Sequence, residues 1–293
     1  METIHERRPE PPREDESKQS HGPEISPKEA RKADEEESLD AKTTYEVIRR
    51  EGQQELERSP SALLWSGLAG GLAMGFSLVG EGLLRAHLPD APWRPLITKL
   101  GYSLGFLIVI LASQQLFTEN TLTPIVPYLA RRTRTMLGKV ARLWGVVLVA
   151  NVVGTLLFAF VVARTDLFDV EARRAFGAIG LEAFGDYFWT TFIRGVFAGW
   201  LIAIMVWMLP AAQSAQVLVI ILITYVVGLG GLAHIIAGSA ETAFVVFSGG
   251  ATWGDYLGRF FVPTLLGNVV GGVTIVAALN HAQVVSGEKR GRG

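Results

Sequence analysis

The chain has 293 residues, of which 49% are hydrophobic and 19% charged, and this is too apolar for an ordinary soluble protein of that length. Residues 1–60 hold 17 of the 28 acidic residues and 11 of the 27 basic ones, so an acidic arm precedes a basic, apolar body. The basic residues form no stripe of the kind that binds nucleic acid, and the absence of cysteine excludes disulfides, thiolate metal sites and cysteine nucleophiles.

The first 60 residues are expected to form a charged cytoplasmic arm. Residues 1–38 are rich in Pro, Glu, Lys and Ser, and they bury too little apolar surface to offset the entropy cost of ordering, which predicts disorder. From about 41 to 58 a weak apolar stripe recurs at helical spacing and ends before Pro60, which predicts a surface helix. A solvated helix that leads into the membrane is favoured over a gate or docking element.

Residues 61–280 are expected to form an all-α transmembrane domain, followed by a basic tail at 281–293. A span needs about 20 mostly apolar residues. Six stretches meet this need, at about 62–83, 96–113, 143–163, 188–209, 217–233 and 260–279.

The second and fifth spans run into polar segments, QQLFTENTLT at 114–123 and HIIAGSAET at 234–242. Non-helical backbone is tolerated at membrane depth only where protein buries it or where it lines a cavity. Each interrupted span is the middle of a set of three, which is typical of inverted repeats whose breaks meet at a central site. The first break is expected to continue as a half-helix from about Glu119 to Leu129.

The Lys and Arg residues of short links predict the orientation in the membrane. The link ARRTRTMLGKVAR, at 130–142, carries five basic residues, and others precede the first span and follow the last. With six spans these segments all fall on one side, which the positive-inside rule assigns to the cytoplasm. We therefore expect a multi-pass protein of the bacterial inner membrane with both termini in the cytoplasm.

His234 is the histidine that lies well inside a predicted span, and it stands at the second break. Histidine titrates near neutral pH, so a small anion that approaches it would favour its protonation and gain a hydrogen bond. The alternative is a neutral, buried histidine bonded to backbone at the break. Glu119 and Glu241, beside the two breaks, are expected to satisfy backbone donors or to form ion pairs.

Four stretches of the chain are similar to motifs of the formate–nitrite transporter family. They are SLGFLIVILASQQLFTENTL at the first break, RGVFAGWLIAIMVW in the fourth span, GLAHIIAGS at the second break and VPTLLGNVVGG in the sixth span. The resemblance covers about Ser61 to Leu279. It implies an aquaporin-like fold, a homopentamer with one pore per protomer, and passage of small monovalent anions such as formate and nitrite.

The resemblance also implies roles for particular residues. Leu116, Phe117 and Thr118 would narrow the pore, His234 would be its central histidine and Asn268 would face the centre. The positions of the family's apolar constriction are held by Tyr102, Phe106, Ile202 and Val227, although apolar residues in spans also serve in helix packing.

The chain departs from the family pattern in its fourth and fifth spans. Gly199 stands where many members have Asn before the Trp of the fourth span, and LEAFGDYFW lacks the Lys that members often carry near the start of that span. Ala233 and Gly238 flank His234 where Glu and Asn occur in other members. The sequence therefore resembles an uncharacterised branch of the family rather than a typical formate channel.

The expected function is passage of small monovalent anions, or of their weak acids, through a pore with apolar constrictions and a central histidine. The alternative is a membrane scaffold or sensor of the same fold with altered or no conduction. An enzyme is not expected, since Ser239 and His234 are a weak basis for a serine protease, and the chain lacks the Asn-Pro-Ala motifs of water channels. The expected partners are the anion, the lipid bilayer and further copies of the chain; no cofactor is expected.

Overall fold

The computed structural model describes residues 26, 41–185 and 187–278, and the regular elements in these ranges are all helices. Apart from residue 26, the arm predicted to be disordered, 1–38, lies outside the described residues, as does the basic tail at 281–293.

Four helical stretches in this part of the chain are long and apolar enough to cross a membrane: Pro60–His87 (α3), Arg94–Leu111 (α4), Arg134–Arg164 (α6) and Phe188–Leu229. The last stretch has 42 residues, which as one helix would extend about 60 Å, twice the thickness of the hydrocarbon core. A 3₁₀ turn at Gln213–Ala215 divides it into α8, Phe188–Ala212, and α9, Gln216–Leu229. It therefore holds the fourth span and the first half of the fifth.

The two predicted breaks are present in the structure. The first follows α4 and leads through a 3₁₀ turn at Glu119–Thr121 into α5, Ile125–Arg131, and the second separates α9 from α10, Ile235–Phe247. The half-helix predicted over 119–129 is wrong at its start, because α-helix begins only at Ile125. Pro124 and Pro127 have no amide hydrogen, so a helix running on from residue 119 would lose two of its backbone hydrogen bonds.

The helices α4 and α9 end in the same way. The amide of Gln114 bonds the carbonyl of Val109 at 2.9 Å, and the amide of Leu232 bonds that of Val227 at 3.0 Å. The residue before each of these amides takes a positive φ, 53° at Ser113 and 57° at Gly231. This six-to-one bond with a left-handed residue is the Schellman ending of a helix. The interrupted helices of the two halves, α4 and α9, thus end in the same Schellman motif.

The sixth span begins earlier than predicted. It runs from a π-helical turn at Tyr256–Phe261 through α12, Val262–Val270, into a second π-helical stretch at Gly271–Ala278. The short helix α11, Trp253–Asp255, precedes it and is closed by a capping box between Thr252 and Asp255.

The link between the third and fourth spans contains a helix that the sequence reading missed. Helix α7, Val170–Ala183, starts at Asp169, whose side chain accepts a hydrogen bond from the amide of Ala172. Its apolar face packs on α3 and α10, with Phe176 fully buried. A helix of 14 residues with charges along its outer face carries too little apolar sequence to be read as a span.

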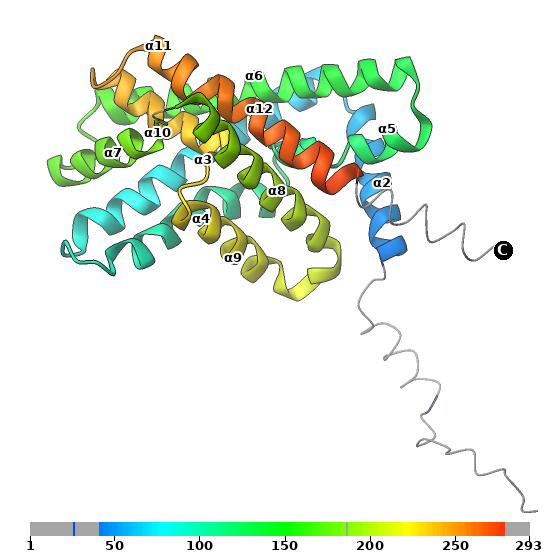
Figure 1. The fold of residues 1–293 in the computed structure, drawn as a ribbon, viewed down its shortest axis with the longest axis horizontal. Coiled ribbons are helices and arrows are strands. Elements are labelled where there is room, and N and C mark those ends of the chain that lie inside the picture. The colour runs from blue at the N-terminus through cyan, green and yellow to red at the C-terminus, as the bar shows by residue number, and fades with distance from the viewer. Residues whose placement is uncertain (1–25, 27–40, 186, 279–293) are drawn as a thin grey trace, which may run out of the picture. The chain divides into compact units, whose positions relative to one another are not determined.

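The spans pack as two related sets of three. In the first set α3 lies against α4 and α6, and in the second α8 lies against α9 and α12, while α4 and α9 lie side by side between the sets (Figure 1). The broken span is the middle member of each set. The molecule is therefore an all-α membrane fold of six spans, with inverted three-helix repeats and two broken helices.

Helix α2, Ala41–Glu57, precedes the first span and packs against α5, α6 and α8. Ile48 and Leu56 are buried, and a Cβ at Gly52 would clash with the backbone carbonyl of Thr123 just after the first break. The helix predicted to be solvated thus has one face in the core of the molecule. It closes over the first break instead of only leading into the membrane.

Candidate functional site

The two breaks meet through one hydrogen bond. Thr118 Oγ1 and His234 Nε2 lie 2.8 Å apart, and both side chains are fully buried. The other ring nitrogen, Nδ1, lies 3.2 Å from the amide nitrogen of Ala237, in the first turn of α10. An amide can only donate, so Nδ1 is an acceptor.

This arrangement determines where the histidine carries its proton. With Nδ1 accepting from Ala237, the neutral ring has its hydrogen on Nε2 and donates to Thr118 Oγ1. A second proton on Nδ1 would break the cap of α10. The hydroxyl hydrogen of Thr118 then remains available as a donor at the centre of the molecule. The ring thus caps α10, as the interpretation of a neutral histidine bonded to backbone expects, and it also bonds Thr118 of the first break; the interpretation of His234 as a partner of an anion stays a prediction.

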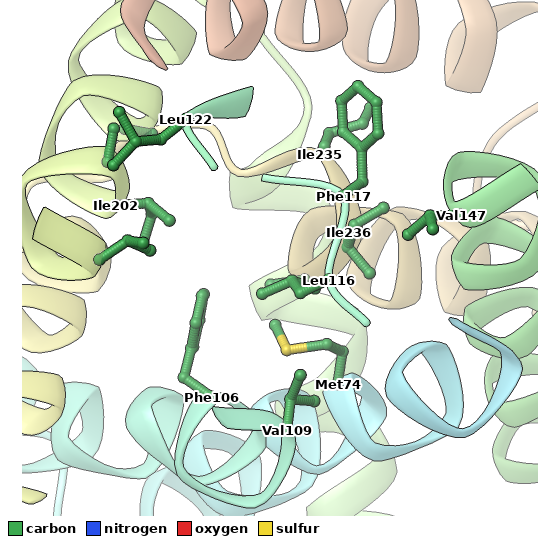
Figure 2. Close-up of a cluster of buried hydrophobic side chains, with 14 of the residues drawn as sticks. Met74, Phe106, Val109, Leu116, Phe117, Leu122, Val147, Ile202, Ile235 and Ile236 are labelled. Atoms are coloured by element: carbon green, nitrogen blue, oxygen red, sulfur yellow. The ribbon is translucent and has the colours of Figure 1, made fainter. Parts of the chain in front are cut away.

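Buried apolar side chains surround this pair, and the sequence-predicted constriction residues are among them. Figure 2 shows Phe106 from α4, Leu116 from the first break and Ile202 from α8 pointing towards one another. The ring of Phe106 meets the imidazole of His234 edge-on, with centroids 4.8 Å apart. Phe117, Tyr102 and Val227 belong to the same buried cluster. Every predicted apolar site residue therefore lies in one core around the breaks.

A cavity opens on each side of this apolar core. The cavity on the α7 side, of about 220 Å³, has His234, Tyr102, Lys99, Arg194 and Glu241 in its wall. We call it the α7-side cavity. The breaks and their apolar neighbours separate it from the cavity beneath α2.

That second cavity, the α2-side cavity, measures about 340 Å³. Its wall includes Glu51 and Glu55 of α2 together with Gln115 and Glu119 of the first break. Glu55 accepts a hydrogen bond of 2.8 Å from the side-chain amide of Gln115, so α2 is tied directly to the break.

Asn268 does not offer its amide to the space between the cavities. Its Oδ1 accepts from the amide of Ile235 at 2.9 Å, and its Nδ2 donates to the carbonyls of Gly195 and Ala233 at 2.9 and 2.8 Å. One donor is used on Ala233 at the second break and the other on Gly195 of α8, so both are bonded to backbone. The structure thus gives Asn268 a supporting role at the break, and the expectation that it faces the pore centre stays a prediction.

Gly199 also has a packing role. It lies where α8 meets α12, and a Cβ there would clash with the backbone oxygen and Cα of Asn268. The position of a Cβ at Gly199 faces the backbone of the sixth span, and the expected place of Gly199 among the pore residues stays a prediction. A side chain such as Asn would force α8 and α12 apart.

A family model described as Formate/nitrite transporter matches residues 42–282. The chain belongs to the formate/nitrite transporter family. It is 44% identical over 244 residues to Inner membrane protein YfdC of Escherichia coli (strain K12), a match that covers 83% of this chain and 79% of that protein. It is 24% identical over 237 residues to Formate channel BtFdhC of Bacillus thuringiensis, covering 79% of this chain and 90% of the relative.

Two solved structures have the same fold. A pentameric formate channel with formate bound matches with a TM-score of 0.65 and 21% identity, and covers 77% of this chain and 98% of its own. An FNT family ion channel matches with a TM-score of 0.69 and 20% identity, covering 80% and 96%. BtFdhC and both solved structures are named as channels, whereas YfdC is named only as an inner membrane protein.

The sequence reading missed two features of this family member's site. Asn151 of α6 supports the first break as Asn268 supports the second, and the repeated string NVVG at 151–154 and 268–271 was the signal for it. Glu241 was expected to satisfy donors or to pair. Within the described residues it has neither a hydrogen bond nor an ion pair, and it lines the α7-side cavity.

Proposed function

We propose that the chain conducts small monovalent anions, or their weak acids, across the bacterial inner membrane between the α2-side and α7-side cavities. The observation that carries this proposal is the hydrogen bond between Thr118 and His234, which joins the two breaks inside an apolar core that separates the cavities. Polar groups at membrane depth with non-helical backbone are typical of a passage. The names of its relatives point to formate as the first solute to test.

The apolar core limits the form in which a solute crosses. A bare anion would lose its hydration among Phe106, Leu116 and Ile202, and this desolvation is costly. Thr118 can donate one hydrogen bond to the solute there through its hydroxyl group. His234 can donate a second from Nε2 if Thr118 rotates away and no longer accepts that hydrogen. A solute that carries its own proton, or gains one at the centre, crosses at much lower cost.

The assembly and orientation are parts of the same proposal. We place α2 and both termini in the cytoplasm, since the basic link 130–142 adjoins α2 and Lys139 bonds Glu57. We also propose a homopentamer with one passage per protomer. It is supported by the matching fold of the pentameric formate channel and by apolar side chains exposed along the spans, such as Leu104, Leu157 and Phe197.

Tracer flux into liposomes tests the proposal. The purified full-length protein is expected to accelerate uptake of formate or nitrite over protein-free vesicles, and His234→Asn is expected to remove the pH dependence while leaving the oligomer intact by size-exclusion chromatography. Lactate, acetate and hydrosulfide complete the solute panel. If the wild-type protein moves none of these at any pH, the chain is a scaffold or sensor of the same fold and the transport proposal fails.

A further inference from the structure

The turn that joins α5 to α6 carries three arginines, Arg131, Arg132 and Arg134, which we call the basic turn. All three residues are exposed, and none of them forms an ion pair within the described part of the chain. The sequence has no acidic residue between Glu119 and Asp166, so these helices bring no neutralising charge of their own. Like charges held together on one turn repel one another, which favours an anion that joins them.

Helix α2 engages the other basic residues of this link. Lys139 pairs with Glu57 at 2.8 Å. Arg142 donates to the backbone carbonyls of Leu56 and Arg58, at 2.8 and 3.2 Å. The helices α2, α5 and α6 contact one another at this end of the molecule (Figure 1). The contacts with α2 therefore use the basic residues inside α6 and leave the basic turn open to another partner.

A small pocket of about 200 Å³ lies between α2 and the basic turn. Its wall includes Arg131, Thr133 and Lys139 from the link, and Gln53 and Glu57 from α2. Because Lys139 offsets the charge of Glu57, Arg131 leaves this wall with a net positive charge. Guanidinium, hydroxyl and amide groups all donate hydrogen bonds, and arginine matches the oxygens of a phosphate especially well. The pocket thus suits a phosphate group.

The basic turn lies at the depth of the lipid headgroups. Asn151 of α6 bonds the amide of Phe117 at the first break, and the paired breaks of inverted repeats lie near the middle of the bilayer. Arg134 precedes Asn151 by 17 residues on the same helix, which is about 25 Å at 1.5 Å per residue. Half a bilayer measures about 20–22 Å with its headgroups, and long arginine side chains can reach back to the phosphates.

The face of α6 that continues from the basic turn into the membrane is apolar and open. Leu137, Val149 and Leu157 are exposed along it. A Cβ at Gly138 or Gly145, between the first two, would meet nothing within 4 Å. Acyl chains can lie on such a strip while their headgroup contacts the arginines. The apolar strip alone would suit another copy of the chain equally well, but three unpaired arginines at its end favour an anionic lipid.

We propose that the basic turn binds the phosphate headgroup of an anionic phospholipid, such as phosphatidylglycerol, whose acyl chains lie along the exposed face of α6. An arginine side chain can hold a phosphate through two parallel hydrogen bonds, and basic groups near the membrane surface attract anionic lipids. A zwitterionic lipid carries a positive charge beside its phosphate, which the three arginines repel. The site lies outside the proposed passage and does not depend on which solute is transported.

The experiment compares two lipids with identical acyl chains, phosphatidylglycerol and phosphatidylcholine, on the full-length protein in detergent. Native mass spectrometry of a lipid titration gives a dissociation constant for each lipid, and the measured quantity is the ratio of the two constants. The wild-type protein is expected to bind phosphatidylglycerol about tenfold or more tightly, and this preference should shrink as the salt concentration rises. The triple variant Arg131→Gln, Arg132→Gln, Arg134→Gln should lose most of the preference.

Arg132→Gly removes one of these charges without a burden on folding. Arg132 ends α5 with a φ of 47°, a left-handed position at which glycine is the usual residue. The variant is expected to reduce the lipid preference about fivefold without lowering the Tm.

A second triple variant and a soluble anion control the result. Arg164→Gln, Arg173→Gln, Arg174→Gln removes the same charge at the other end of α6 and on α7, and it should keep the wild-type preference. Inorganic phosphate at the same concentration should not displace bound phosphatidylglycerol, because it has no acyl chains to bury on α6.

Several results would overturn the proposal. Equal affinity of the wild-type protein for the two lipids would do so, and so would an equal loss of preference in both triple variants, since net charge alone would then explain the binding. Displacement of the lipid by inorganic phosphate would make the basic turn a site for free anions. A first triple variant that keeps the preference but loses its oligomeric state would assign the turn to a contact between copies. If that variant does not fold, Arg132→Gly decides, and a wild-type preference there would exclude the turn.

Discussion

Asn151 and Asn268 make equivalent hydrogen bonds to the backbone in the two halves of the molecule. Asn151 accepts a hydrogen bond of 2.8 Å from the amide of Phe117 and donates to the carbonyls of Gly67 and Gln115. Asn268 makes the corresponding three bonds around the second break. Each side chain thereby ties the backbone of a broken span to the first helix of its own set of three.

Replacing either asparagine by aspartate is expected to destabilise the protein strongly. Asn151→Asp and Asn268→Asp keep the shape but remove two donors and place a carboxylate against two carbonyl oxygens. A buried group left without its partner costs about 1–3 kcal/mol, and more when it is charged. Thermal unfolding in detergent should show a large drop in Tm for both variants.

Thr155→Val is the matched control for the asparagine variants. Thr155 lies one turn from Asn151, and its hydroxyl bonds only a carbonyl of its own helix, so a small effect is expected. Equal Tm values for the aspartate variants and the wild type would show that the breaks do not depend on these side chains.

Gly71 and Gly199 explain why the asparagines can reach the breaks. A Cβ at Gly71 would clash with the backbone of Asn151, and a Cβ at Gly199 would clash with that of Asn268. Overpacking of this kind costs about 1–3 kcal/mol, so Gly199→Ala should lower the Tm, and Gly199→Asn should lower it further. Gly145→Ala is the control, because nothing lies within 4 Å of a Cβ there and alanine is the better helix former. A Gly199→Asn variant that melts like the wild type would contradict this packing.

Much of the fold follows from hydropathy, because lipid requires long apolar helices and polar runs such as 114–123 mark the places where a span is broken. The roles of single polar residues do not follow in the same way. A polar side chain inside a span is compatible with two roles, lining the passage or bonding to backbone groups. The hydrogen bonds between Asn268 and the backbone become known only from the structure. The lack of a hydrogen-bond or ion-pair partner for Glu241 among the described residues could not be predicted for the same reason, since it depends on which neighbours already have partners. Helix α7 was not predicted because it is only 14 residues long and charged residues interrupt its apolar sequence.

The Thr118 hydroxyl is expected to be required for flux, if the proposed function holds. Thr118→Val keeps the shape but leaves the Nε2 hydrogen of His234 without an acceptor, at a cost of about 1–3 kcal/mol, and it removes the free donor at the centre. Formate exchange in liposomes should fall by about tenfold or more, since about 1.4 kcal/mol corresponds to one factor of ten. Thr118→Ser keeps the hydroxyl and should exchange at close to the wild-type rate. Equal rates for Val and Ser would remove Thr118 from the mechanism.

Leu116 is expected to set the width of the apolar core for bulkier solutes. Its side chain is fully buried and points towards Phe106 and Ile202 (Figure 2). Leu116→Ala should raise the rate of lactate exchange relative to formate, because a wider apolar constriction admits larger solutes and water. Leu157→Ala, at a half-exposed position of α6, should leave the ratio of the two rates unchanged. An unchanged ratio in Leu116→Ala as well would place the narrowest part of the passage elsewhere.

Helix α2 is expected to lose its packing against α5 and the first break when Gly52 is replaced by a residue with a side chain. A Cβ at Gly52 would clash with the carbonyl of Thr123 and reach the ring of Pro127 at 3.1 Å, so Gly52→Ala cannot keep the same contact with α5. The cost of about 1–3 kcal/mol falls on the docked state alone, which should speed hydrogen exchange of residues 41–57 by about tenfold or more. Gln54→Ala, at an exposed position of the same helix, should leave protection as it is. If Gly52→Ala also keeps full protection, the bond between Glu55 and Gln115 is enough to hold α2 over the break, and a Glu55→Ala, Gly52→Ala double variant should then release it.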